Sequence, residues 1–211
     1  MSYPGPATSA LLLSGGESQR FGGEPKALLD VRGEPAILRM HRIVQRFGLE
    51  PIVVVEPPHP TPLEDLVWKL GCEVVHSDRL LRGRTASIQE GLARLPAKSD
   101  VLLWPVDHSF VGMGTIQALL AARDRDPVGR WFVPKHEGRG SHPVLIGHEV
   151  LPRIALLQDH QPLRHLLPML GPLVVSVPVP DVEVAEPIDA PEAYRRAQLR
   201  AEPPEVAWTH G

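Results

Sequence analysis

An apolar run that ends in two glycines is the feature of this sequence that most restricts its fold. Leu11–Leu13 is too short to span a membrane, and Ser14 and the pair Gly15-Gly16 follow it directly. Such a run is typical of a buried strand that turns into a loop at the edge of a sheet. Because glycine has no Cβ, backbone N–H groups in this loop can come close to phosphate oxygens. Arg20 and Lys26 bring positive charge into the same loop, so the segment predicts a binding site for a nucleoside triphosphate (NTP).

Short runs rich in Val, Leu and Ile alternate with stretches of helical periodicity along the chain. The expected strands are Ala10–Ser14, Pro51–Val55, Glu73–His76, Asp100–Val106, Trp131–Pro134 and Leu173–Val177, and the expected helices are Pro35–Phe47, Thr61–Leu70, Thr85–Leu95 and Gly114–Arg123. This alternation predicts an α/β fold, Rossmann-like and doubly wound, with a mainly parallel sheet. Ligands bind such sheets at the carboxyl ends of the strands, so the loops after Leu13 and Val106 are expected at one edge.

Composition predicts one domain over residues 1–211, with a core from about residue 10 to 197 and short proline-rich tails at both ends. The formal charge of −3 and the scattered Lys and Arg residues provide no basic field for nucleic acid, which is excluded as a partner. The single Cys72 cannot form an internal disulfide, and neither a signal segment nor a membrane span is apparent. We therefore expect a cytoplasmic protein that does not bind membranes.

Asp107 follows the apolar run Asp100–Val106 directly. An aspartate that leaves a buried strand at this edge can hold Mg²⁺, which prefers one or two carboxylates together with substrate oxygens and water. Taken alone, the residue could equally cap a turn. Its position after the strand favours the magnesium site.

The first loop resembles the signature of the MobA-like nucleotidyltransferases, L-x-[AG]-G-x-S-x-R-[MF]-G-x-x-K. The residues in register are Leu13, Gly15, Gly16, Ser18, Arg20, Phe21 and Gly22, and Lys26 comes one residue late, after an extra Gly23. The resemblance implies the fold of the nucleotide-diphospho-sugar transferases. It also implies that Leu13, Ser14, Gly15, Gly16, Arg20 and Lys26 bind the nucleotide. Arg20 and Lys26 are then catalytic as well, because they stabilise charge on the triphosphate and the leaving pyrophosphate.

Two aspartates match the metal-binding positions of the same family. The segment around Asp107 is similar to the family pattern apolar-apolar-x-x-D-x-P-x-[VI], although Ser109 replaces the proline and Val106 stands where many members have glycine. The resemblance makes Asp107 a catalytic metal ligand. Asp189, in a segment that resembles the closing element [DN]-[IV]-D-T-P-E-D-[YL], is implied as the second ligand or as the residue that orients the first. Ala190 replaces the threonine there, and Asp189 could also cap the helix that the next proline opens.

Two further segments resemble the cytidylyl-type branch of the family. Gly83–Leu92 is similar to G-x-x-x-S-[IL]-x-x-G-[IL], which implies nucleotide contacts from Ser87 and from Arg84, with Arg82 as the alternative phosphate contact, at a helix start suited to anions. Gly138–Ile146 is similar to G-x-x-G-H-P-V-[LI]-[FI], with Ser141 in place of the second glycine. It implies weaker contacts of His142 and His108 with the acceptor substrate. A solvated serine at a helix start and packed histidines are the alternatives.

The matches run in order from Ala10 to Tyr194, so the chain is identified as a member of the MobA-like family, of the molybdenum cofactor cytidylyltransferase type. The implied reaction joins a nucleoside monophosphate from an NTP to a phosphate-bearing acceptor such as molybdopterin, releases pyrophosphate and requires Mg²⁺. A guanylyltransferase or a sugar-phosphate nucleotidyltransferase of the same fold is an alternative. A third is an accessory protein that binds nucleotide or cofactor without turnover and serves a molybdoenzyme or its chaperone. The departures at Val106, Ser109, Ser141 and Ala190 keep this last alternative open.

Different segments of the sequence point to different bases for the NTP. The pair Gly15-Gly16 resembles the guanylyl type, because the absence of a methyl group leaves room for a purine. The segments Gly83–Leu92 and His142–Ile146 resemble the cytidylyl type over more positions. The longer match predicts CTP, with GTP as the alternative.

Overall fold

A seven-stranded sheet runs through the centre of the computed structural model, which describes residues 7–14, 21–55, 62–77, 83–126 and 128–200. Its strands lie in the order β5-β4-β1-β6-β8-β7-β9, with bounds β5 Glu73–His76, β4 Glu50–Val55, β1 Thr8–Leu13, β6 Asp100–Pro105, β8 Val144–Ile146, β7 Trp131–Lys135 and β9 Val174–Pro178. All neighbours pair in parallel except β8, which is antiparallel to both β6 and β7. The predicted α/β fold with a mainly parallel sheet is confirmed.

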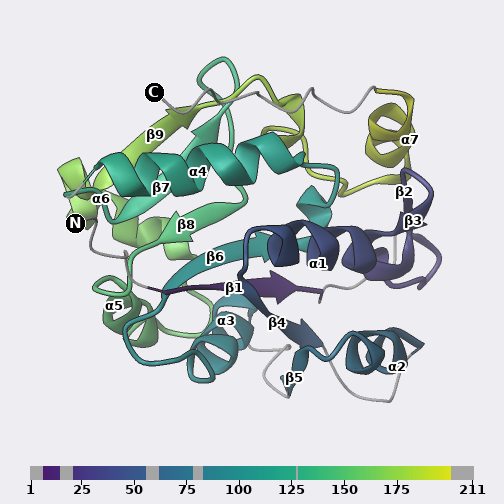
Figure 1. Cartoon of the computed structure of the whole chain (residues 1–211), viewed down its shortest axis with the longest axis horizontal. Helices are drawn as coiled ribbons and strands as arrows, with labels where there is room; N and C mark the ends of the chain where they lie inside the picture. The colour runs from purple at the N-terminus through teal and green to yellow at the C-terminus, as the bar shows by residue number, and fades with distance from the viewer. Residues whose placement is uncertain (1–6, 15–20, 56–61, 78–82, 127, 201–211) are drawn as a thin grey trace.

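Helices cover both faces of this sheet (Figure 1). One face carries α1 (Ala36–Arg46), α2 (Pro62–Lys69) and α4 (Met113–Arg125), and the other carries α3 (Arg84–Leu92), α5 (Leu151–Ala155) and α6 (Leu167–Leu170). Alternate residues of a strand point to opposite faces, so Ala10 and Leu12 pack in the first layer while Leu11 and Leu13 pack in the second. A strand buried on both faces has to be apolar throughout, which explains the continuous apolar run in β1.

Most elements lie where the sequence predicted them, with ends shifted by a few residues. The strand β8 was not among the expected strands, because three apolar residues give no periodicity to detect. The same holds for the two-residue strands β2 (Asp30–Val31) and β3 (Glu34–Pro35) and for the short helices α5 and α6. Within the described ranges, no helix combines the length and apolarity needed to cross a bilayer.

The carboxyl ends of β1 and β6 form one edge of the sheet, as expected. Leu13 lies opposite Pro105 in the parallel pair, so the first loop and the loop after β6 leave the sheet side by side. The β2–β3 hairpin and the last helix, α7 (Pro191–Leu199), lie beyond this edge, on the side toward which β1 points (Figure 1).

Candidate active site

The first loop starts from a buried position. Leu13 and Ser14 are both less than a tenth exposed at the end of β1. Gly15, Gly16 and Arg20 lie outside the described residues, so their predicted nucleotide contacts stay predictions. After Phe21, which is described again, Gly22 and Gly23 adopt φ angles of 67° and 88°. Both values lie in the left-handed region that favours glycine, so the extra residue Gly23 is accommodated in a turn.

Lys26 opens the short helix η2 (Lys26–Leu28), which lies against the helical turn that carries Asp107. The Lys26 Nζ lies 5.4 Å from the centroid of the Phe21 ring, within the range of a cation–π contact. The Phe21 ring in turn meets Tyr194 edge-on, with the ring centroids 6.3 Å apart. Aromatic packing therefore orders the Lys26 side chain, and the helix η2 that carries it contacts the turn of the predicted metal ligand despite the extra glycine in the loop.

Asp107 occupies the helical turn η4 (Val106–His108) directly after β6. Its side chain is 17% exposed, and Oδ2 lies 3.5 Å from the Arg84 guanidinium, which is 58% exposed. The other oxygen, Oδ1, is buried and has no hydrogen-bond partner in the part of the chain that the structure describes. An ionised oxygen without a partner is costly to bury, and a cation would satisfy it. The capping alternative therefore does not account for this carboxylate.

The closing segment brings Asp189 to the same edge of the sheet. The Ile188 backbone N–H donates to the Asp107 carbonyl at 2.7 Å, so the residue before Asp189 is pinned to the backbone of the first aspartate. Asp189 itself is exposed. The expectation that it caps the last helix is wrong, because α7 begins at Pro191 with Ala190 as its N-cap and has no side-chain cap.

The helix α3 brings its two predicted residues to different environments. Arg84, the first residue of the helix, lies 3.5 Å from Asp107, and the alternative Arg82 lies outside the described residues. The Ser87 hydroxyl is buried and lies 3.0 Å from the hydroxyl of Ser77, at the end of β5. This bond anchors α3 to the sheet, and the nucleotide contact predicted for Ser87 remains a prediction.

His108 and His142 lie together, with ring centroids 5.6 Å apart. His108 is buried, and desolvation lowers the pKa of its imidazole despite the opposing charge of Asp107. Burial and the neighbouring His108 also lower the pKa of His142. Both rings are therefore neutral at pH 7. The Nδ1 atom of His142 is buried and has no hydrogen-bond partner among the residues described here, so it can still accept or donate one bond.

Two buried charged residues that the sequence analysis missed hold the loop after Asp107. The Arg39 guanidinium donates to the carbonyls of Ser109, at 3.2 Å, and Val111, at 2.9 Å. Asp181 accepts from the Gly112 N–H and the Thr115 hydroxyl, each at 2.8 Å, and so fixes the start of α4. An arginine inside the apolar stripe of α1 was the available signal. These bonds hold the loop where Ser109 replaces the family's proline.

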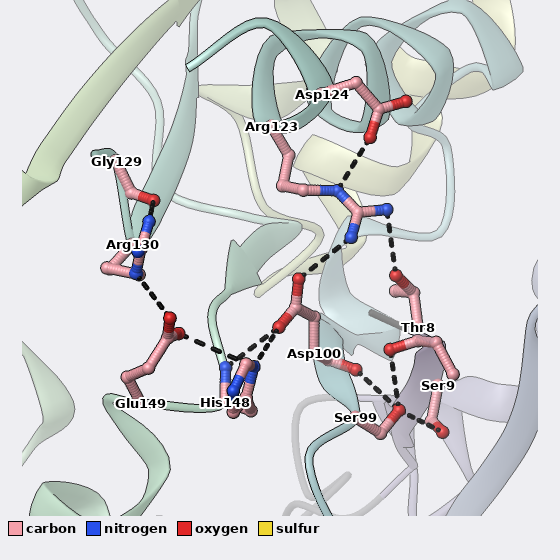
Figure 2. A network of polar contacts seen from close by, with 11 residues as sticks. Thr8, Ser9, Ser99, Asp100, Arg123, Asp124, Gly129, Arg130, His148 and Glu149 are labelled. Atoms are coloured by element: carbon pink, nitrogen blue, oxygen red, sulfur yellow. Dashed lines mark hydrogen bonds and ion pairs between the residues drawn. The ribbon is translucent and has the colours of Figure 1, made fainter. Parts of the chain in front are cut away.

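A second polar cluster lies at the opposite edge of the sheet, where β6 begins (Figure 2). Asp100, His148 and Glu149 bring possible metal-ligand atoms within 4.8 Å of one another. However, Asp100 accepts from Arg123 at 3.0 Å, and Glu149 pairs with Arg130 at 2.8 Å. Each carboxylate is thus already paired with a guanidinium, so the cluster is an ion-pair network that ties β6, α4 and the end of β8 together.

Comparison with known proteins decides the family. Residues 10–174 match the model of the MobA-like NTP transferase domain. The chain belongs to the MobA-like NTP transferase family. It is therefore a nucleotidyltransferase, and the fold, the enzyme class and the family predicted from the sequence are confirmed.

Individual relatives agree with this family. The molybdenum cofactor guanylyltransferase of Ectopseudomonas mendocina (strain ymp) is 29% identical over 202 residues, which cover 92% of this chain and 93% of the relative. The solved structure of molybdopterin-guanine dinucleotide biosynthesis protein A from Archaeoglobus fulgidus aligns with a TM-score of 0.65 at 18% identity, over 90% of this chain and 96% of that one. Rv0371c from Mycobacterium tuberculosis, in complex with manganese, aligns with a TM-score of 0.69 at 18% identity, over 92% and 99% of the two chains. The two structural likenesses show the fold.

Proposed function

We propose that this MobA-like nucleotidyltransferase joins a nucleoside monophosphate from an NTP to the phosphate of molybdopterin and releases pyrophosphate. The observation that carries the proposal is the position of Asp107. Its carboxylate lies at the carboxyl end of β6, beside the first loop, with one buried oxygen that no described residue satisfies. The molybdopterin acceptor is supported by the name of the E. mendocina relative, which aligns over most of both chains.

The donor set at this edge fits a divalent cation such as Mg²⁺. Asp107 offers a carboxylate oxygen that no described residue satisfies. Asp189 directly follows Ile188, whose N–H donates to the Asp107 carbonyl. Two carboxylates that leave the remaining positions to water and phosphate oxygens are the donors that Mg²⁺ prefers. When bound, the cation would neutralise charge on the α-phosphate.

The side chains around the carboxylates supply position and positive charge. Lys26 and Arg20 would contact the triphosphate and stabilise the leaving pyrophosphate. Arg84 already faces Asp107, and its ion pair is weak because the guanidinium is more than half exposed, so little free energy opposes its transfer to a phosphate. Ser14, Gly15 and Gly16 would bring backbone N–H groups to the nucleotide.

The acceptor itself is the nucleophile in this reaction. One oxygen of its phosphate forms a bond to the α-phosphorus while the bond to the β-phosphate bridge breaks, so no covalent enzyme intermediate is needed. The only cysteine of the chain, Cys72, is buried, and desolvation raises the pKa of its thiol to about 11. It is therefore unsuited to serve as a nucleophile. His142, which lies beside His108 next to the Asp107 turn, is our candidate for a contact with the acceptor.

For the base we propose GTP, with CTP as the second candidate. The glycine pair at residues 15 and 16 and the name of the E. mendocina relative favour guanine. The likeness of Gly83–Leu92 and His142–Ile146 to cytidylyl-type segments favours cytosine, the base that the sequence analysis predicted. A pocket that hydrogen-bonds one base can reject another by several orders of magnitude, so a direct assay separates them.

The test is to incubate the protein with molybdopterin, MgCl₂ and each NTP in turn, and to follow pyrophosphate and the nucleotidylated product. Product from GTP supports the proposal as stated. Product from CTP alone shows that the base is cytosine and supports the rest of the proposed reaction. If every NTP fails with molybdopterin but one of them reacts with a sugar phosphate, the acceptor is wrong. Nucleotide binding without product from any acceptor would favour the accessory-protein alternative, including service to a molybdoenzyme or its chaperone.

A further inference from the structure

His108 is tied to two distant parts of the chain through its ring. Its Nδ1 lies 3.1 Å from the backbone carbonyl oxygen of Glu183, and its Nε2 lies 3.3 Å from the hydroxyl of Ser141. Glu183 belongs to the turn η7 (Val182–Val184), which precedes the segment that carries Asp189. The ring therefore stands between three chain segments that are far apart in the sequence.

The partners of the ring decide which nitrogen carries the proton. A carbonyl oxygen only accepts hydrogen bonds, so Nδ1 must carry the hydrogen and donate to Glu183. Nε2 of the neutral ring is then an acceptor, and the Ser141 hydroxyl donates to it. The shorter contact, to Glu183, is the better hydrogen bond of the two.

Backbone hydrogen bonds also join the same three segments to one another. The Ile188 N–H donates to the Asp107 carbonyl at 2.7 Å, and the Ser141 N–H donates to the Val184 carbonyl at 3.0 Å. The Glu183 side chain is buried and paired with Arg200 at 3.1 Å, which fixes the turn that receives the histidine. Asp107 and Asp189 thus lie on two segments that hydrogen bonds hold together, and the His108 side chain makes one of these bonds.

We propose that His108 is a positioning residue that holds the Asp107 segment against the Glu183–Asp189 segment, and so brings the two carboxylates to one metal site. This inference rests on the proposed function, because it assumes that both aspartates serve a metal. It replaces the acceptor contact predicted for His108 from the sequence, since the ring is buried and uses both nitrogens within the protein.

Two amide substitutions separate the two bonds of the ring. In His108→Asn, the amide nitrogen can take the place of Nδ1 and donate to the Glu183 carbonyl. In His108→Gln, the amide group reaches the place of Nε2 and can accept from Ser141, but it leaves the Glu183 carbonyl without its donor. The two variants are both polar and neutral, so each is a matched control for the other.

The measurement is Mn²⁺ affinity of the full-length protein, by electron paramagnetic resonance, with and without a non-hydrolysable NTP. We expect His108→Gln to weaken Mn²⁺ binding at least about 10-fold at an unchanged folded fraction, and His108→Asn to recover most of the affinity. Turnover should follow the same order, with a lower kcat and an unchanged KM for the acceptor. Equal Mn²⁺ affinity in His108→Gln and the wild type overturns the proposal, as does a higher acceptor KM in both variants at unchanged Mn²⁺ affinity.

Asp107→Asn, measured in parallel, separates this inference from the function on which it rests. If Asp107→Asn loses Mn²⁺ while His108→Gln retains it, the metal site stands and the role of His108 is wrong. If Asp107→Asn retains both Mn²⁺ affinity and turnover, the metal site itself is wrong, and the inference is overturned with it.

Discussion

Replacing Asp107 with asparagine should separate catalysis from folding. The amide keeps the size of the side chain but removes the charge that faces Arg84 and the proposed metal. Since the Arg84 guanidinium is 58% exposed, losing this ion pair should cost less than about 1 kcal/mol of unfolding free energy. The buried Oδ1 has no hydrogen bond to lose among the described residues. We therefore expect a nearly unchanged Tm.

The expected effect on turnover is much larger. A carboxylate that holds the metal on the α-phosphate contributes several kcal/mol of transition-state stabilisation. A loss of about 2.7 kcal/mol corresponds to about 100-fold in rate, which we take as the minimum for Asp107→Asn. The assay is pyrophosphate release at saturating NTP, acceptor and Mg²⁺, with thermal unfolding of the same samples.

An exposed carboxylate supplies the control. Asp65→Asn, on the surface of α2, should leave both turnover and Tm unchanged. Turnover of Asp107→Asn within threefold of the wild type would refute the assignment of this residue to the metal. A drop of Tm as large as that of a core substitution would refute the argument that its charge is dispensable for folding.

Three further predictions address separate parts of the structure. Lys26→Ala should weaken NTP binding and slow turnover, while the loss of the half-buried cation–π contact with Phe21 should lower the unfolding free energy by only about 0.5–1 kcal/mol. Calorimetry and kinetics measure the effects on binding and turnover. If Lys26→Ala changes neither and Arg20→Ala is severe, Arg20 supplies the charge that binds the triphosphate. Burial lowers the pKa of His41, so the folded state favours the neutral imidazole. Its contribution to the unfolding free energy is complete above the unfolded pKa of about 6.5 and decreases as the pH falls below that value. Urea unfolding between pH 7.5 and 5.5 should therefore show a smaller loss of stability in His41→Leu than in the wild type, and equal losses would contradict this. Gly83 has φ 122°, and a Cβ there would lie 2.5 Å from the Asp159 carbonyl oxygen. Gly83→Ala should therefore lower the unfolding free energy by more than about 1 kcal/mol and slow turnover. A Tm equal to that of the wild type would show that the Asp159 backbone moves aside at no cost.

The sequence alone determined the succession of most elements and the edge of the sheet at which the proposed site lies. Continuous apolar runs such as Leu11–Leu13 are typical of strands buried on both faces, and their alternation with helices favours a mainly parallel sheet. Parallel pairing then forces the carboxyl ends of β1 and β6 to one edge. The glycine pair and Asp107 could be proposed as phosphate-binding and metal-binding residues because such sites depend on short, local patterns.

Only the tertiary structure decided how distant segments meet at that edge. The bond from Ile188 to Asp107 and the bonds of His108 to Ser141 and Glu183 join residues 33 to 81 positions apart, and no periodicity encodes such pairs. The buried charges of Arg39 and Asp181 were hidden for a related reason. Charged residues are mostly exposed, and a sequence does not show which of them find carbonyl or N–H partners inside the fold. Local patterns thus specify the elements, whereas long-range hydrogen bonds fix the geometry of the site.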